Sequence, residues 1–212
     1  MSEQRRRGLI QFCSENRLPI IEDGAYQELC FGKVTTPLKA FDQNGIVLYL
    51  GSASKTLAPG LRIGWVIAPE PIVQRLGDVK MQMDYGASSI SQWIFAEFLS
   101  GGLHEIYLKT LKQTLRQRRD SALAVLEKHY KDLAVWRRPE GGFYIWLTLK
   151  RPVAMERLFE KAIQEKILLN PGDMYDFARN DSLRLSYAYT NPEEFEQSAI
   201  RLAEIIREEW KD

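Results

Sequence analysis

The chain has 212 residues, of which 45% are hydrophobic and 27% charged, and its formal net charge is +1. This is the composition of a globular protein with a sizeable core, and the near-zero charge gives no electrostatic footprint for nucleic acid. The sequence contains no apolar run near the roughly 20 residues that span a membrane. Its cysteines and histidines form no disulfide framework and no zinc motif: Cys13, Cys30, His104 and His129. We therefore expect a cytoplasmic protein without a bound metal.

The first hundred residues predict an α/β arrangement. Residues 2–16 have the pattern of a helix with Ser2 as its N-cap. Short apolar segments with the composition of strands follow: 18–21, 46–50 and 62–68. The link between the second and third is short for a parallel crossover, so we expect the third strand to run antiparallel. Helical patterns cover residues 72–83 and 90–99.

Longer helices and half-buried strands are predicted beyond Gly101. A long amphipathic helix is marked by Leu108, Leu111, Leu115, Ala122 and Leu126, and it is interrupted at Arg118 and Arg119. The remaining predicted elements are a strand over 143–149, a helix over 155–166, a strand over 183–187 and a terminal helix capped by Asn191 with Pro192 in its first turn. This change of pattern predicts two domains, residues 1–100 and 101–212.

Polar side chains of complementary chemistry are predicted to meet at one edge of the first sheet. Asp23 lies at the carboxyl end of the first strand and Lys55 just beyond that of the second. Arg62, at the start of an antiparallel third strand, would lie at the same edge, with Ser52 and Ser54 nearby. In α/β sheets, ligands bind beyond the carboxyl ends of the strands.

This set of groups suits an aldehyde cofactor that carries a phosphate and a ring nitrogen. The amine of Lys55 can form a Schiff base. The carboxylate of Asp23 opposite a pyridine nitrogen would keep that nitrogen protonated, which is the partner arrangement used for pyridoxal phosphate. A guanidinium and hydroxyl groups bind a phosphate through charge-assisted hydrogen bonds. Tyr26 could offer its phenol to the oxygen of the ring.

Each residue also has a simpler interpretation when it is taken alone. Asp23 followed by Gly24 is typical of a turn, a lysine after a strand is usually a solvated charge, and Arg62 could be any arginine at a strand edge. Residues 52–55 also fit the S-x-x-K pattern of penicillin-binding proteins, with Ser52 as the nucleophile. That motif should open a helix, yet Pro59 follows closely, and no S-D-N or K-T-G motif occurs downstream. Acyl transfer is therefore disfavoured.

A set of motifs in order along the chain resembles the pyridoxal-phosphate-dependent aminotransferases of fold type I (class I/II). The motifs are EDGAY at 22–26, SASKTLAPGLRIGW at 52–65, PEGGFYIWL at 139–147 and LRLSYAY at 183–189. The resemblance implies an α/β fold and pyridoxal 5'-phosphate as the cofactor.

The resemblance also implies a role for each matching residue. Lys55 would bond covalently to the cofactor and then act as a general base. Asp23 would pair with the pyridine nitrogen and Tyr26 with the phenolic oxygen of the cofactor. The phosphate would be held by Ser52, Ser54 and Arg62. Arg184 would bind the α-carboxylate of the substrate as a bidentate pair, and without the resemblance it would be interpreted equally well as a structural ion pair.

The amino-acid sequences of several segments are most similar to one branch of the family. KMQMDYGASSISQ, QRRD, FYIWL and ILLNPGDMY resemble the aminotransferase-like domain of GntR/MocR-type transcriptional regulators, in which a winged-helix DNA-binding domain comes first. Free-standing 2-aminoadipate and aromatic aminotransferases share most of these motifs. The resemblance thus implies a homodimeric enzyme that exchanges an amino group between an amino acid and a 2-oxo acid. The alternative is an effector-sensing domain of a regulator that contacts DNA only through an upstream domain absent from this chain.

The family fold normally has a long segment before the strand that ends in EDGAY. We therefore expect this chain to be a carboxyl-terminal portion: a three-strand piece of the large domain's mixed sheet with its helices, plus a complete small α+β domain. Such a piece would expose a strand edge and an apolar face. We expect it either to self-associate or to bind the cofactor weakly, and a nonfunctional fragment is a further interpretation.

Overall fold

The computed structural model describes residues 1–176 and 181–211, which form two compact units. The first unit is Met1–Leu111 and the second is Lys112–Asp212. The predicted domain boundary near Gly101 precedes helix α4 (Leu103–His129), and the two compact units divide inside that helix. Among the described residues, none of the helices combines the length and apolar character that crossing a membrane requires.

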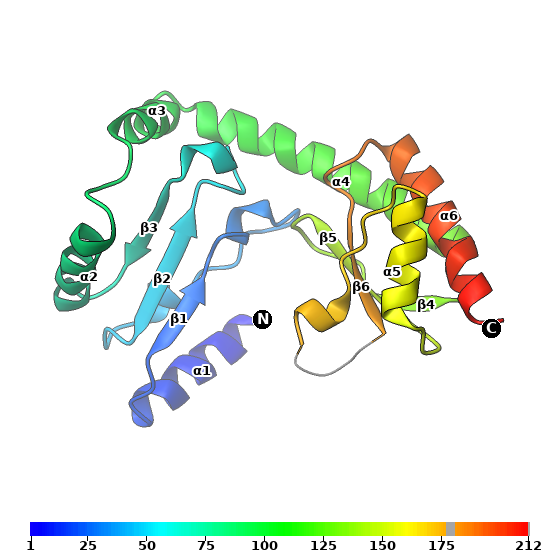
Figure 1. Ribbon diagram of the computed structural model, residues 1–212. Helices are drawn as coiled ribbons and strands as arrows, with labels where there is room; N and C mark the ends of the chain where they lie inside the picture. The colour runs from blue at the N-terminus through cyan, green and yellow to red at the C-terminus, as the bar shows by residue number, and fades with distance from the viewer. Residues whose placement is uncertain (177–180, 212) are drawn as a thin grey trace. The chain divides into compact units, whose positions relative to one another are not determined.

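The first unit is built on a sheet in the order β1-β2-β3 (Figure 1). Its strands are β1 (Ile20–Asp23), β2 (Val47–Ser52) and β3 (Gly64–Ile67). β1 pairs parallel with β2, and β3 pairs antiparallel with β2. This pairing confirms the predicted direction of the third strand. The connection between β2 and β3 is too short for a parallel crossover, so the chain returns antiparallel.

Helix α1 (Glu3–Glu15) packs beside this sheet, and the Ser2 side chain caps it by accepting a hydrogen bond from the Arg5 N–H, as predicted. Ile10 of α1, Leu38 and Val47 form a small buried cluster. The segment between β1 and β2 is fixed by the Glu22 carboxylate, whose oxygens accept the backbone N–H groups of Leu38 at 2.8 Å and Lys39 at 2.9 Å. This holds the 3-10 turn η2 (Leu38–Phe41) against the sheet.

Asp42 anchors the start of β2. Its carboxylate accepts backbone N–H groups from Asn44, Ile46 and Val47 and pairs with the Lys39 ammonium at 3.0 Å. Burial alone would raise the pKa of Asp42, but the hydrogen bonds from Val47, Lys39, Ile46 and Asn44 outweigh it and lower that pKa below its ordinary value. A charged carboxylate thus defines where the second strand begins.

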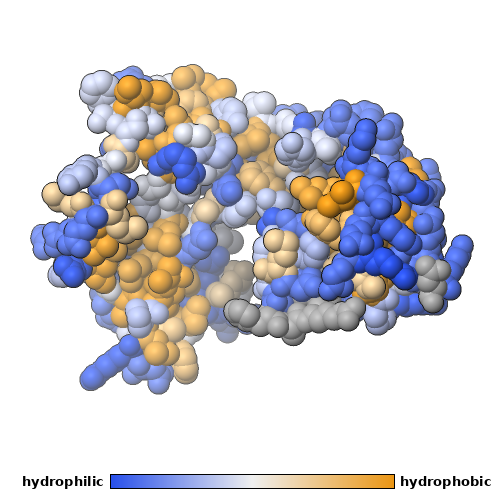
Figure 2. Space-filling model, viewed as in Figure 1, coloured by the Kyte–Doolittle hydropathy of each residue, from blue (hydrophilic) through white to orange (hydrophobic). Residues whose placement is uncertain are grey.

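The remaining helices of the first unit leave much apolar surface uncovered. α2 (Glu70–Met83) and α3 (Ser89–Ser100) contain no buried residue. The exposed fraction reaches 69% for Ile21 on the sheet, 81% for Met83 and 72% for Trp93. Figure 2 shows hydrophobic surface over this unit on the face in view. The expected apolar exposure is present, while association between copies stays a prediction.

The second unit is an antiparallel sheet in the order β4-β5-β6 with helices packed on it. Its strands are β4 (Ala134–Trp136), β5 (Tyr144–Leu149) and β6 (Ser182–Ser186). Its other helices are α5 (Met155–Gln164) and α6 (Pro192–Glu209). The predicted cap of the last helix is confirmed as a capping box, in which Asn191 and Glu194 satisfy each other's backbone N–H groups. The Tyr130 hydroxyl donates to the Ala199 carbonyl at 2.7 Å and ties the end of α4 to α6.

The predicted interruption at Arg118 and Arg119 is wrong, because α4 is continuous from Leu103 to His129. Arg119 is buried, with an exposed fraction of 4%, and its guanidinium donates to Asp120 Oδ1 and to the Pro139 carbonyl at 2.8 Å. Arg118 donates to the Ala188 carbonyl at 2.7 Å. Both arginines can therefore lie on the packed side of the helix, because backbone carbonyls of other segments accept hydrogen bonds from their guanidinium groups.

Replacing Glu209 with glutamine tests the buried ion cluster of the second unit. The Glu209 side chain is 1% exposed and pairs with Arg157 at 2.6 Å and Lys161 at 2.5 Å. Burial would raise the pKa of Glu209, but hydrogen bonds from Lys161 and Arg157 lower it below its ordinary 4.5. The stabilisation is therefore present above pH 4.5 and is lost as pH falls through the lowered pKa.

We expect Glu209→Gln to lower the free energy of unfolding at neutral pH by about 1–3 kcal/mol, as lost charged hydrogen bonds do. Urea unfolding across a pH series measures this, and the difference from the unmodified chain should narrow in acid. Glu204→Gln is the control, because its carboxylate is half-exposed and pairs with Arg201 at the surface. An equal loss for both variants at neutral pH would contradict the prediction.

A second prediction concerns Gly24, the residue after β1. A Cβ atom built there would lie 2.2 Å from the Tyr49 Oη, which donates to Gln27 Oε1 at 3.0 Å. We expect Gly24→Ala to displace the Tyr49 ring and to lower the free energy of unfolding by about 1–3 kcal/mol, the usual cost of overpacking. Urea unfolding measures the loss. Gly32→Ala is the matched control, since nothing lies within 4 Å of its Cβ position, and equal stability of the two variants would refute the clash.

Candidate cofactor and substrate sites

The turn after β1 places Asp23 at the carboxyl edge of the first sheet. Asp23 pairs with Leu50 in the parallel ladder, and the next N–H, that of Gly24, donates to the Leu50 carbonyl at 2.8 Å. The Asp23 Oδ1 accepts the Ala25 N–H at 3.0 Å, which closes a tight turn. The carboxylate is therefore exposed at the edge where the sequence predicts it.

A compact loop after β2 carries Lys55. The Ser52 Oγ accepts the Ser54 N–H at 3.1 Å, and the Ala53 carbonyl accepts the N–H of Leu57 at 2.9 Å. Ala53 is buried under the loop, whereas Lys55 is only partly covered. The Lys55 Nζ lies 5.6 Å from the centroid of the Tyr26 ring, within the range of a cation–π contact. Lys55 and Tyr26, which the sequence assigns to one site, thus meet in the structure.

Arg62 lies at the same edge but does not begin the third strand as predicted. It follows the 3-10 turn η3 (Pro59–Leu61) in the left-handed region, with φ of 56°, and β3 starts only at Gly64. The Ala53 N–H donates to the Ile63 carbonyl at 3.1 Å, which brings Arg62 back toward the lysine loop. Its exposed guanidinium donates to the Pro59 carbonyl at 3.1 Å. A left-handed conformation at a residue other than glycine costs roughly 1–3 kcal/mol, and such strain concentrates at functional sites.

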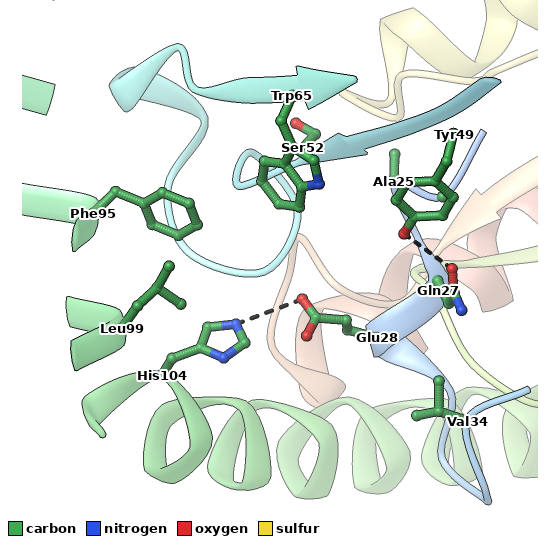
Figure 3. A pocket seen from close by; sticks show the side chains of 11 residues that line it. Ala25, Gln27, Glu28, Val34, Tyr49, Ser52, Trp65, Phe95, Leu99 and His104 are labelled. Atoms are coloured by element: carbon green, nitrogen blue, oxygen red, sulfur yellow. Dashed lines mark hydrogen bonds and ion pairs between the residues drawn. The ribbon is translucent and has the colours of Figure 1, made fainter. Parts of the chain in front are cut away.

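A cavity of about 470 Å³ opens beside this edge within the first unit (Figure 3). Gly24, Ala25 and Ser52 belong to its lining, next to the predicted site residues. Trp65 stacks on Phe95 with centroids 5.9 Å apart, and His104 Nε2 lies 3.5 Å from Glu28 Oε2. The rest of the lining is Gln27, Val34, Tyr49 and Leu99.

Tyr49 gives this cavity a neutral hydrogen-bonding wall. Burial raises the pKa of its hydroxyl, and the negative charges of Glu22, Glu28 and Asp23 raise it further. Tyr49 and His104 line the cavity but were not predicted from the sequence as site residues. The alternation of β2 could have indicated that Tyr49 faces away from Leu50, but only the fold brings His104 to Glu28.

Arg184 belongs to the second unit, at the middle of β6, where it pairs with Trp146 of β5. Its guanidinium carbon lies 4.1 Å from the Tyr144 ring centroid and 4.6 Å from that of Tyr175. Its Nε is buried and has no hydrogen-bond partner among the described residues. The alternative interpretation of Arg184 was a structural ion pair. Among the described residues, no carboxylate pairs with Arg184.

A cavity of about 610 Å³ opens beside Arg184 within the second unit. Lys166, Asn170 and Ser186 lie in its wall, and the described residues that line it include no aspartate or glutamate. Two cations without a nearby counter-ion in the wall favour an anionic ligand. Arg184 and the residues around Lys55 therefore provide separate chemistry, each set within its own unit.

The residues from 2 to 202 match the family "Aminotransferase class I and II". An uncharacterized HTH-type transcriptional regulator of Bacillus subtilis, YisV, is 47% identical over 208 residues, covering 98% of this chain and 43% of that protein. The HTH-type transcriptional regulator NorG of Staphylococcus aureus is 34% identical, covering 98% of this chain and 47% of NorG. The chain thus spans less than half the length of these curated relatives.

Solved structures match this chain over all or nearly all of its length. A Pyrococcus horikoshii kynurenine aminotransferase, solved in complex with PMP, superposes with a TM-score of 0.94 at 32% identity, over 100% of this chain and 53% of that one. The α-aminoadipate aminotransferase LysN of Thermus thermophilus, complexed with N-(5'-phosphopyridoxyl)-L-leucine, gives a TM-score of 0.91 at 29% identity, over 97% of this chain and 54% of that one. The expected α/β aminotransferase fold is confirmed, and this chain belongs to the class I and II aminotransferase family.

Proposed function

We propose that this chain carries the pyridoxal phosphate site of an aminotransferase-type domain, with Lys55 as the residue that bonds to the cofactor. The observation that carries the proposal is the placement of the Lys55 amine 5.6 Å from the Tyr26 ring, at the edge where Asp23 ends β1. An amine, a phenol and a carboxylate gather there from two segments that are remote in sequence. The amine and the carboxylate are the partners that pyridoxal phosphate uses for its aldehyde and its ring nitrogen, and the phenol can donate a hydrogen bond to the oxygen of the ring.

The residues present fit the cofactor. The Ser52 Oγ already accepts the Ser54 N–H, so its own hydroxyl proton can be donated to an anionic oxygen. Arg62 is held in a strained left-handed conformation, and its guanidinium bonds only a carbonyl among the described residues, so charge remains for a phosphate. When bound, pyridoxal phosphate supplies an electron sink for the bond that breaks at the α-carbon of an amino acid.

The protein side of the chemistry then follows from the individual groups. Asp23 would hold a proton on the ring nitrogen, and Tyr26 would orient the ring through its hydroxyl. Ser52, Ser54 and Arg62 would hold the phosphate in place. Lys55 would move a proton as a general base once it is free of the cofactor. Arg184 would bind the carboxylate of an amino acid or a 2-oxo acid through its paired N–H groups. The reaction is transfer of an amino group between these two substrates, in a homodimer.

A second candidate function is sensing. The relatives YisV and NorG are named as HTH-type transcriptional regulators, and this chain covers less than half of each. The same site would then bind pyridoxal phosphate or an amino acid as an effector, and DNA would be bound by a separate upstream domain. Because the cofactor contacts would be the same in both cases, the Lys55 loop does not distinguish the two functions.

Reductive labelling tests the cofactor site directly. Pyridoxal phosphate is added, the mixture is reduced with borohydride, and the modified lysine is mapped by mass spectrometry of peptides. We expect the label on Lys55 and its loss to background in Lys55→Ala. Lys80→Ala is the control, since its amine pairs with Asp84 on the surface of α2. A label on another lysine, or an unlabelled wild-type chain, would overturn the assignment.

The release of 2-oxo acid separates the enzyme from the sensor. We expect the loaded protein to convert an amino acid to its 2-oxo acid, measured across a panel of amino acids by mass spectrometry. Arg184→Gln should raise the half-saturating amino acid concentration roughly tenfold or more, because a charged hydrogen bond is lost. Arg201→Gln, whose guanidinium pairs with Glu165 and Glu204 at the surface, should behave as wild type. Amino acid binding without release of product would favour sensing.

A further inference from the structure

The aromatic residues around Arg184 form a connected set that the cofactor site does not use. We propose that Tyr144 and Tyr175 are positioning residues, which fix the Arg184 guanidinium in the orientation that receives a carboxylate. The inference rests on the proposed role of Arg184 in carboxylate binding. Neither tyrosine would touch the reacting atoms, since each acts through the arginine.

The contacts of the guanidinium are made through ring faces. Its central carbon lies 4.1 Å from the Tyr144 centroid and 4.6 Å from the Tyr175 centroid. An arginine donates hydrogen bonds only in the plane of its guanidinium, whereas it stacks on aromatic rings through its faces. Contacts of this kind restrict the group while its donor edge stays available. The buried Nε without a partner among the described residues fits a side chain that is held by rings rather than by acceptors.

Tyr175 is itself held in register with Arg184. Its hydroxyl donates to Asn170 Oδ1 at 2.7 Å, and its ring meets Trp146 edge-on, with centroids 5.9 Å apart and planes at 73°. The backbone carbonyl of the same Asn170 accepts the Arg184 N–H at 2.9 Å. One residue thus fixes both the backbone of the arginine and the ring that contacts its side chain.

The sheet also links both tyrosines to Arg184. Trp146, which holds the Tyr175 ring, is the cross-strand partner of Arg184, and Tyr144 lies two residues before Trp146 on the same face of β5. The segment that follows η4 (Gly172–Met174) is therefore joined to β5 and β6 at the arginine. Packing alone would not require the hydrogen bond of the Tyr175 hydroxyl, the backbone hydrogen bond from Arg184 to Asn170 and two ring contacts to one guanidinium.

The test measures how accessible Arg184 is and how well a carboxylate covers it. Phenylglyoxal modifies exposed guanidinium groups, and peptide mapping reports the rate at Arg184 alone. Propionate serves as the probe, because it carries only the carboxylate that all amino acids share and needs no cofactor. In the wild-type chain we expect slow modification that propionate slows further.

The variants separate positioning from general packing. We expect Tyr175→Leu to raise the modification rate and to raise the half-protecting propionate concentration roughly fivefold or more, through the lost ring contact. Tyr175→Phe, which keeps the ring, should restore most of the protection. Tyr144→Leu is the second ring-removing variant and decides the question if Tyr175→Leu does not fold. Tyr85→Leu is the matched control, because that tyrosine is 100% exposed, lies in the first unit and should leave both values unchanged.

Each outcome distinguishes this inference from the cofactor proposal. An unchanged half-protecting concentration in a folded ring-removing variant would overturn the positioning role. Wild-type Arg184 that propionate does not protect would overturn the carboxylate role and this inference with it. The labelling of Lys55 is independent of both results, so the cofactor site is judged separately.

Discussion

The parallel pairing of β1 with β2 is the constraint on which the candidate cofactor site depends. The ladder ends with Asp23 opposite Leu50, and the Gly24 N–H extends it by one more bond at 2.8 Å. Because a parallel ladder aligns the carboxyl ends of its strands, Asp23 and Ser52 leave the sheet at one edge. The Lys55 loop follows Ser52 directly, so its amine reaches the Tyr26 ring through backbone geometry that the two strands have already fixed.

The return of the chain into β3 completes this edge and explains the odd conformation of Arg62. Ser52 pairs with Gly64, and the bond from Ala53 to the Ile63 carbonyl closes the loop between them. Pro59 starts a 3-10 turn, and Arg62 must then adopt a left-handed conformation to join it to the antiparallel strand. The sheet supplies the stabilisation that offsets this strain, since the ladder on both sides of the loop leaves few other paths.

Local patterns predicted much of this arrangement from the sequence, and tertiary contacts account for what was missed. The helix caps at Ser2 and Asn191 and the antiparallel direction of the third strand depend on residues that are close in sequence, so they can be predicted from a single sequence. Strand β4 was not predicted, because three residues are too few to show a period. The burial of Arg119 depends on a distant carbonyl, and the contact between Lys55 and Tyr26 was expected only because both residues were assigned to one edge. The roles of these site residues remain predictions.

The two proposed sets of functional groups lie in different units, and this bears on how an enzyme and a sensor would differ. The Lys55 amine, the Asp23 carboxylate and the groups proposed to bind phosphate lie in the first unit, and Arg184 is held by contacts within the second. A substitution in either set can therefore leave the other intact. Since cofactor binding is common to both functions, a chain could lose transamination and keep the cofactor by changes confined to the surroundings of Arg184.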